Sequence, residues 1–194
     1  AYTAERKILG VNCGQMDQYA SALGNVLYMD CTTEPATPTF LRPNTILPLV
    51  IGDTKQSKDT PMILAWLGER FAQRERLFMD GMTEIVSIVE EAKHELTKEN
   101  PDLERIGELM NLNQHYLKDY LRVSGDCPVS PNGLDLLIEV SLSAGALGAK
   151  LSGSGGGGAM VALCRPQDVD SVAEAIRKKG GEAFVTVVAK EGLS

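Results

Sequence analysis

The middle of the chain carries apolar residues at helical spacing in four separate stretches. The first begins at Thr60-Pro61, an N-cap residue followed by proline at the first helical position. The second stops before Asn100-Pro101, and the third runs from about 103 to 121. The fourth opens at Ser130-Pro131 and ends near Gly145. We therefore expect four successive helices.

The C-terminal part changes pattern. Short apolar runs at 149–151 and 159–163 flank a glycine-rich segment, and a helical pattern at 166–179 leads to a last apolar run at 183–188. A further buried strand is expected at 49–51. Strand, helices, strand, strand, helix, strand is a ferredoxin-like order. The predicted fold class is α+β, an antiparallel sheet with helices on one face.

The N-terminal part predicts shorter elements. Residues 1–9 resemble the last turns of a helix, and because no cap precedes them we expect that something precedes residue 1 in the natural protein. Asn12 and Gln15 resemble a capping box, which predicts a helix over about 13–23. A short strand at 26–30 follows, and four prolines between 34 and 48 favour extended chain.

Charge and length restrict the class of protein. The 194 residues include 19 Lys plus Arg and 26 Asp plus Glu, for a net charge of −7, which disfavours nucleic acid as a partner. No apolar run approaches the roughly 18 residues of a membrane span, and no signal peptide opens the chain. A protein of the cytoplasm, without a membrane partner, is the expectation.

Cysteine and histidine give little support for a metal site. The four cysteines are far apart and form no Cys-x-x-Cys pair, so neither a zinc site nor a disulfide framework is indicated. Only His94 and His115 are present, both inside helical patterns. No metal ligand is assigned from the residues.

The glycine-rich segment is the strongest candidate for chemistry. Five of the seven residues from 152 to 158 are glycine and the other two are serine. Backbone without Cβ atoms lets a phosphate approach, and successive N–H groups can form an anion nest. A Walker A loop is excluded because no Gly-Lys-Ser/Thr follows and a strand comes next. The alternative is a plain hairpin connection, but two to five residues suffice for one, which favours contact with a ligand.

Asp17 is the second candidate. It lies early in the predicted helix over 13–23, where the positive end of the helix dipole favours an ionised carboxylate. Such a carboxylate could accept a proton from a hydroxyl. A single helical aspartate is more often a surface or capping residue, so the residues alone do not establish catalysis.

Two separated motifs resemble one enzyme family. Gly10-Val-Asn-Cys-Gly-Gln-Met-Asp-Gln18 and Leu27-Tyr-Met-Asp-Cys31 resemble the catalytic helix and next strand of galactokinases. Leu147-Gly-Ala-Lys-Leu-Ser-Gly-Ser-Gly-Gly-Gly-Gly158 resembles the third signature motif of the GHMP kinases (galactose, homoserine, mevalonate and phosphomevalonate kinases). Residues 109–115 and 118–124 are similar to the segment that precedes this motif in galactose and mevalonate kinases. The resemblance covers about residues 1 to 190.

The resemblance implies a role for each matching residue. Asp17 matches the catalytic aspartate, which takes or orients the proton of the substrate hydroxyl. The loop that closes near the nucleotide phosphates is matched by Gly153, Ser154, Gly155 and Gly156. The strand end that faces the acceptor in mevalonate kinases is matched by Asp53, Thr54 and Lys55. These roles suit phosphoryl transfer, in which positioning and charge stabilisation dominate.

One family feature is missing from these residues. The main phosphate-binding loop, a Pro-x-x-x-Gly-Leu-x-Ser-Ser-Ala stretch, does not occur. The resemblance therefore implies the C-terminal part of an ATP-dependent kinase: residues 1–45 as a remnant of the N-terminal, ribosomal S5-like domain with the catalytic helix, and 46–194 as the C-terminal domain. Mg²⁺ ligands are expected in the missing segment, and this chain alone is expected to be inactive.

The acceptor and the activity leave alternatives open. The catalytic helix favours a galactose-type sugar, whereas the glycine loop and Gly52-Asp-Thr54 are closer to mevalonate kinases; we lean slightly to a sugar. A non-catalytic galactokinase-like regulator that binds ligand would share the same motifs. A structural α+β interaction domain is a third interpretation. The expected partner is a small-molecule alcohol, with a homodimer as a further possibility.

Overall fold

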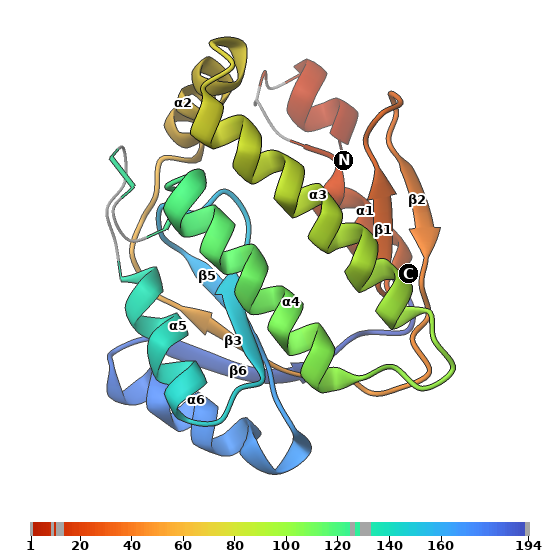
Figure 1. Ribbon diagram of the computed structural model, residues 1–194, viewed down its shortest axis with the longest axis vertical. Coiled ribbons are helices and arrows are strands. Elements are labelled where there is room, and N and C mark those ends of the chain that lie inside the picture. The colour runs from red at the N-terminus through yellow and green to blue at the C-terminus, as the bar shows by residue number, and fades with distance from the viewer. Residues whose placement is uncertain (1, 9, 11–13, 125–126, 129–132, 193–194) are drawn as a thin grey trace.

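Four antiparallel strands form the main sheet. The computed structural model describes all residues except 1, 9, 11–13, 125–126, 129–132 and 193–194 (Figure 1). The strands are β3 (Pro48–Asp53), β4 (Gly148–Leu151), β5 (Ala159–Leu163) and β6 (Glu182–Val187). They lie in the order β4-β5-β3-β6, and each neighbouring pair is antiparallel. This confirms the predicted α+β class and its ferredoxin-like strand order.

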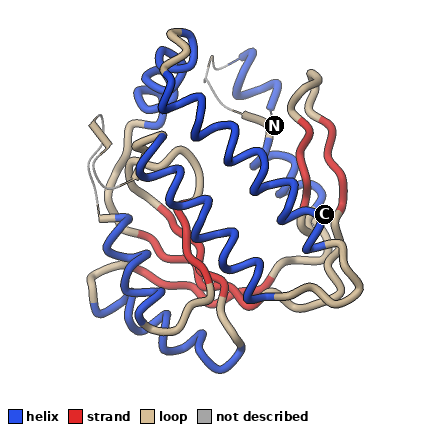
Figure 2. The backbone as a smooth tube through the Cα atoms, viewed as in Figure 1, coloured by secondary structure: helices blue, strands red, loops and turns tan. Residues whose placement is uncertain are grey.

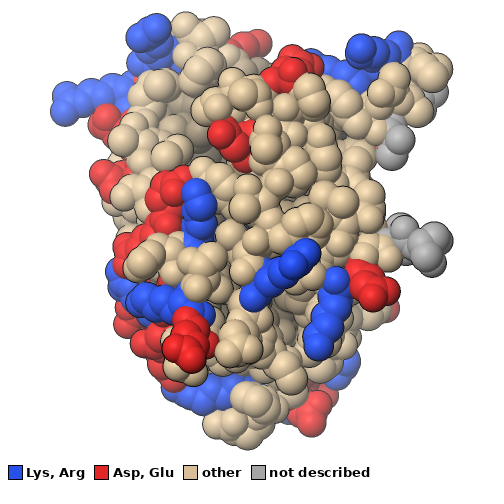
Figure 3. Space-filling model, turned by 90° about the vertical axis from the view of Figure 1, so that its right-hand side faces the viewer, with Lys and Arg blue, Asp and Glu red and all other residues tan. Residues whose placement is uncertain are grey.

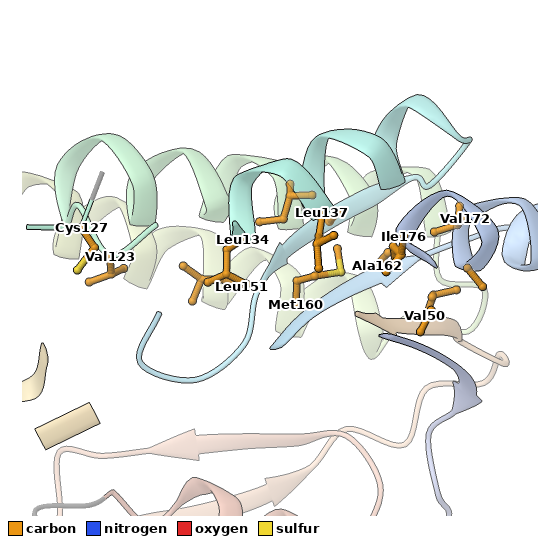
Figure 4. Packing of buried hydrophobic residues seen from close by; sticks show 14 of the residues in the cluster. Val50, Val123, Cys127, Leu134, Leu137, Leu151, Met160, Ala162, Val172 and Ile176 are labelled. Carbon is orange, nitrogen blue, oxygen red and sulfur yellow. The ribbon is translucent and has the colours of Figure 1, made fainter. Parts of the chain in front are cut away.

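Two helices cover one face of this sheet. They are α5 (Leu134–Ser143), which packs on β4 and β5, and α6 (Val169–Lys178), which follows a 3₁₀ turn at Pro166–Asp168 and packs on β3 and β6. The alternate side chains of the strands meet them in a closed hydrophobic core (Figure 4). Completely buried members include Val50, Met160, Ala162, Leu134 and Ile176. Burial of this apolar area, at roughly 25 cal/mol per Å², holds the sheet and the helices together.

Helix α4 (Leu103–His115) lies along the free edge of β4. It forms a long antiparallel pair with α3 (Arg76–Leu96), and α2 (Thr60–Ala72) precedes this pair in the chain (Figures 1 and 2). Asn111 of α4 accepts from Ala149 N at 2.9 Å and donates to Leu147 O at 3.1 Å. Gln114 accepts from Leu151 N at 2.9 Å. Two amide side chains of α4 therefore satisfy backbone groups that an edge strand would otherwise expose.

The N-terminal segment forms a separate small layer beside α3. It contains a π-helical turn at Ala4–Ile8, helix α1 (Met16–Leu23) and a hairpin of β1 (Leu27–Asp30) with β2 (Thr37–Phe40). The hairpin rests on α3, because Lys93 Nζ lies 3.7 Å from the Tyr28 ring centroid and the Tyr28 hydroxyl donates to Glu90. The division of the chain at residue 45 stays a prediction.

Several element boundaries differ from those expected. Helix α1 begins at Met16, and Gln15 precedes it with its side-chain oxygen accepting from Ala36 N at 3.0 Å instead of closing a capping box. Asn12 and Ser130-Pro131 lie outside the described residues. Asp59, not Thr60, caps α2 by accepting from Met62 N at 2.9 Å. The predicted helix over 103–121 divides into α4 and a π-helical turn at Tyr116–Tyr120.

Lys150 is the one charged side chain of β4, and it points into an apolar cavity of about 300 Å³. The cavity is lined mainly by aliphatic residues, among them Leu49, Ile88, Ile106 and Leu163. Burial lowers the pKa of Lys150 from 10.5 to about 8. Because the folded state disfavours the charged form of Lys150, burial of this side chain lowers the free energy of unfolding by its full amount below about pH 8. This destabilisation fades as the pH rises towards 10.5, where the unfolded chain also loses the proton.

We therefore expect Lys150→Met to stabilise the fold at neutral pH. One pKa unit corresponds to about 1.4 kcal/mol, which sets an upper limit of about 3 kcal/mol. The lost hydrogen bond from Lys150 Nζ to Leu151 O offsets about 1 kcal/mol of it. The measurement is thermal unfolding at pH 7 and pH 9.5, with Lys178→Met, an exposed lysine on α6, as the control. A Tm difference from wild type that does not shrink at pH 9.5 would contradict the explanation.

Candidate functional site

One pocket brings together the two motifs that the sequence singled out. Asp17 on α1 and Gly153 with Ser154, from the loop between β4 and β5, line the same pocket of about 440 Å³. Thr60 and Pro61, at the start of α2, complete its polar end, while leucines from α2 and from the segment after α4 form its apolar wall. Residues more than 130 positions apart in the sequence thus face one space that is large enough for a small molecule.

The glycine loop is held at its middle and at both of its ends. Gly156 N donates to Val123 O at 2.8 Å, and Ser152 N donates to Ala159 O at 2.9 Å. At the far end Thr54 N donates to Gly158 O at 3.0 Å, and Gly158 N donates to Thr54 Oγ1 at 3.1 Å. The loop is therefore a shaped element on the sheet and not a loose hairpin connection.

The backbone N–H groups at the front of the loop remain available. Within the described part of the chain, the amides of Gly153, Ser154 and Gly155 donate to no acceptor. Gly153 and Gly155 have φ of +82° and +75°, a conformation that glycine adopts without strain. Successive amides in such a turn form a concavity that attracts anions. The helix N-terminus of α2 adds its positive end beside Ser154, whose Oγ lies 3.4 Å from Thr60 Oγ1.

Lys58 adds a full positive charge to this loop, and the sequence analysis missed it. A Cβ placed on Gly153 or on Gly158 would lie 3.4 Å from Lys58 Nζ, so the ammonium lies directly over the loop. No ion pair occupies it among the residues that the structure describes. Its closeness to Thr54 in sequence was the only available signal, because nothing local indicates that the chain after β3 turns back over the loop.

Asp53, Thr54 and Lys55, which the sequence proposed for binding the acceptor, lie in different surroundings in the structure. Thr54 lies against the far end of the glycine loop through its two hydrogen bonds with Gly158. Asp53 accepts from Lys55 N at 2.8 Å, which closes a local turn after β3, and Lys55 is exposed. None of the three lines the pocket of Asp17. Their role in acceptor binding stays a prediction.

Asp17 is placed as the helix-dipole argument requires. It is the second residue of α1, it is exposed, and it faces the pocket with Gln18 beside it. Gln18 Nε2 donates to the Glu5 carboxylate at 3.1 Å, which fixes the orientation of the amide and leaves its oxygen, Oε1, as the atom still to be accounted for. This Oε1 is buried and has no partner within the described residues. A carboxylate and an amide oxygen, both acceptors of hydrogen bonds from hydroxyl groups, therefore come from the same turn of helix.

Neither a metal-binding cluster nor a membrane-spanning helix occurs among the residues that the structure describes. Among the described residues, no group of three or more His, Cys, Asp and Glu side chains is arranged to hold a metal ion. No helix in this part of the chain has the length and apolar character needed to cross a bilayer. Acidic and basic side chains are interspersed on the face drawn in Figure 3.

Comparison with known proteins identifies the family. The family model described as GHMP kinases C terminal matches residues 80–182, which include α4, the glycine loop and the strands β4 and β5 on either side of it. The chain belongs to the GHMP kinase family.

Three relatives show how far the likeness extends. Mevalonate kinase of Pyrococcus furiosus is 34% identical over 196 residues, covering 99% of this chain and 54% of that protein. Galactokinase of Actinobacillus succinogenes is 26% identical over 235 residues, covering 98% of this chain and 58% of that protein. The crystal structure of L. major mevalonate kinase in complex with R-mevalonate superposes with a TM-score of 0.71 at 25% identity, over 81% of this chain and 47% of that one. The chain spans about half the length of the curated relatives it matches.

Proposed function

We propose that the full-length protein is an ATP-dependent kinase that transfers the γ-phosphoryl group to a hydroxyl of a small molecule. The observation that carries the proposal is the shared pocket of Asp17 and the glycine loop. A candidate proton acceptor and a candidate phosphate cradle face one space, as transfer to an alcohol requires. Membership of the GHMP kinase family supports it.

Each group has a distinct task in the proposed reaction. The amides of Gly153, Ser154 and Gly155, with Lys58, bind the phosphate oxygens and stabilise the charge that develops on them. Asp17 accepts the proton of the acceptor hydroxyl as its oxygen bonds to the γ-phosphorus and the bond to the β-phosphate breaks. Mg²⁺ accompanies the nucleotide and neutralises phosphate charge. Its protein ligands are not assigned to this chain.

Mevalonate is the acceptor that we place first. The 34% identity with a mevalonate kinase over nearly the whole chain exceeds the 26% with a galactokinase, which reverses the slight preference for a sugar drawn from the catalytic helix. The Asp17 carboxylate, which lines the pocket, suits an acceptor with a hydroxyl group to donate. A galactose-type sugar is the second candidate, because the motif around Asp17 resembles that of galactokinases.

The test is ADP release by the full-length protein. With Mg-ATP, we expect release with mevalonate and little with galactose or homoserine. The 194-residue chain alone is expected to release none, and a homodimer stays a prediction for the full-length protein. ADP release with galactose but not with mevalonate would show that the acceptor is a sugar. No release with any acceptor, together with a rise in Tm on adding ligands, would overturn catalysis in favour of a ligand-binding regulator.

A further inference from the structure

One buried amide connects the start of the glycine loop with the turn that holds the middle of the loop. Gln114 on α4 is 7% exposed, and its Oε1 accepts from Leu151 N at 2.9 Å, one residue before the loop begins. Its Nε2 donates to Ser124 Oγ at 3.0 Å. Ser124 directly follows Val123, whose carbonyl accepts from Gly156 N. The start of the loop and the turn on which its middle rests are thus joined through a single side chain.

The hydrogen bonds that run from Leu151 through Gln114 to Ser124 can point in only one direction. The amide of Leu151 can only donate, so Oε1 of Gln114 faces it and Nε2 faces Ser124. The Ser124 hydroxyl, which accepts from Gln114, donates its own hydrogen to Asp135 on α5. The other oxygen of Asp135 pairs with Lys118 Nζ at 2.9 Å. Ser124 is 1% exposed, so a wrong orientation at any step leaves a buried polar atom unsatisfied.

We propose that Gln114 and Ser124 are positioning residues for nucleotide binding, which hold Leu151 and Val123 at a fixed separation so that the loop amides point into the pocket. This inference rests on the proposed function, since it assumes that the loop binds phosphate. Neither residue lines the pocket of Asp17, so both act through the loop. A cradle made of backbone amides depends on sub-ångström geometry, which makes it sensitive to the groups that support it.

Asn111 provides a matched control on the same helix. It lies one turn before Gln114, and its amide also bonds the edge of β4, to Ala149 N and Leu147 O. It has no link to Ser124 or to Val123. Asn111→Leu therefore removes the same kind of contact with the same strand, without disconnecting the loop from its resting place.

The experiment is calorimetric titration of Mg-ADP into the full-length protein. We expect Gln114→Leu and Ser124→Ala each to raise the Kd at least fivefold, with the stoichiometry still one per chain. The Kd of Asn111→Leu is expected to stay within twofold of wild type, even if its Tm falls as much as the Tm of Gln114→Leu. The double variant of Gln114 and Ser124 is expected to raise the Kd little beyond the larger single effect, because both act through one link.

The outcomes separate this inference from the proposed function. Kd values for Gln114→Leu and Ser124→Ala equal to that of Asn111→Leu, with wild-type protein binding Mg-ADP, would overturn the positioning role and leave the kinase proposal standing. A wild-type protein that does not bind Mg-ADP would overturn both. If Gln114→Leu fails to fold, Ser124→Ala removes one oxygen atom only and decides the question alone.

Discussion

Asp17→Asn in the full-length protein is expected to lower kcat by about 10²–10⁴-fold, the usual contribution of a positioned acid–base group. Asparagine keeps the size of the side chain and can still accept a hydrogen bond, but it cannot take the proton of the acceptor hydroxyl. Asp17 is exposed at the second position of α1, so the substitution leaves packing unchanged. Steady-state ADP release with saturating Mg-ATP and mevalonate measures the effect.

A second helix supplies the control for this prediction. Asp170 is also exposed and is also the second residue of its helix, α6, no residue of which lines the pocket. Asp170→Asn therefore changes the same helix-end charge without touching the pocket, and its kcat is expected to remain within twofold of wild type. Turnover of Asp17→Asn within a few-fold of wild type would mean that this carboxylate is not the proton acceptor.

The parts of the fold that follow local rules were predictable from the sequence. The antiparallel, ferredoxin-like sheet was predictable from the order of the elements along the chain, because strand, helices, strand, strand, helix, strand is the order typical of that fold. The glycine run was recognisable as a special loop because so many positive-φ positions admit few other residues. Asp17 was recognisable mainly through its resemblance to a family motif.

The parts that depend on tertiary contacts were not predictable. Lys58 reaches the loop only because the chain folds back after β3, and no local pattern indicates this return. Gln114 looks like an ordinary polar residue of a helix, whereas in the structure it lies at the edge of a strand 37 residues later. The role of Gln15 was missed for a similar reason: its side-chain oxygen accepts from Ala36 N, which lies between the two strands of the hairpin.

Gly155→Val is expected to have the other large effect, a rise of at least tenfold in the Kd for Mg-ADP. Gly155 has a φ of +75°, and a Cβ placed on it would lie 2.1 Å from Val123 O, which is closer than two such atoms can approach. Because that carbonyl also accepts from Gly156 N, the loop must leave its resting place to admit the side chain. Gly153 and Ser154 would then be displaced from their positions in the pocket wall.

Gly180 separates this steric effect from backbone strain. It follows α6, has a φ of +85°, has nothing within 4 Å of a Cβ built on it, and does not line the pocket. Gly180→Val therefore carries the strain of a β-branched residue at positive φ, about 1–2 kcal/mol, without displacing a neighbour. We expect it to lower the Tm and to leave the Kd for Mg-ADP unchanged. A Gly155→Val protein that is folded and binds Mg-ADP as tightly as Gly180→Val would show that the loop does not hold the phosphates, because the substitution disturbs the loop and little else.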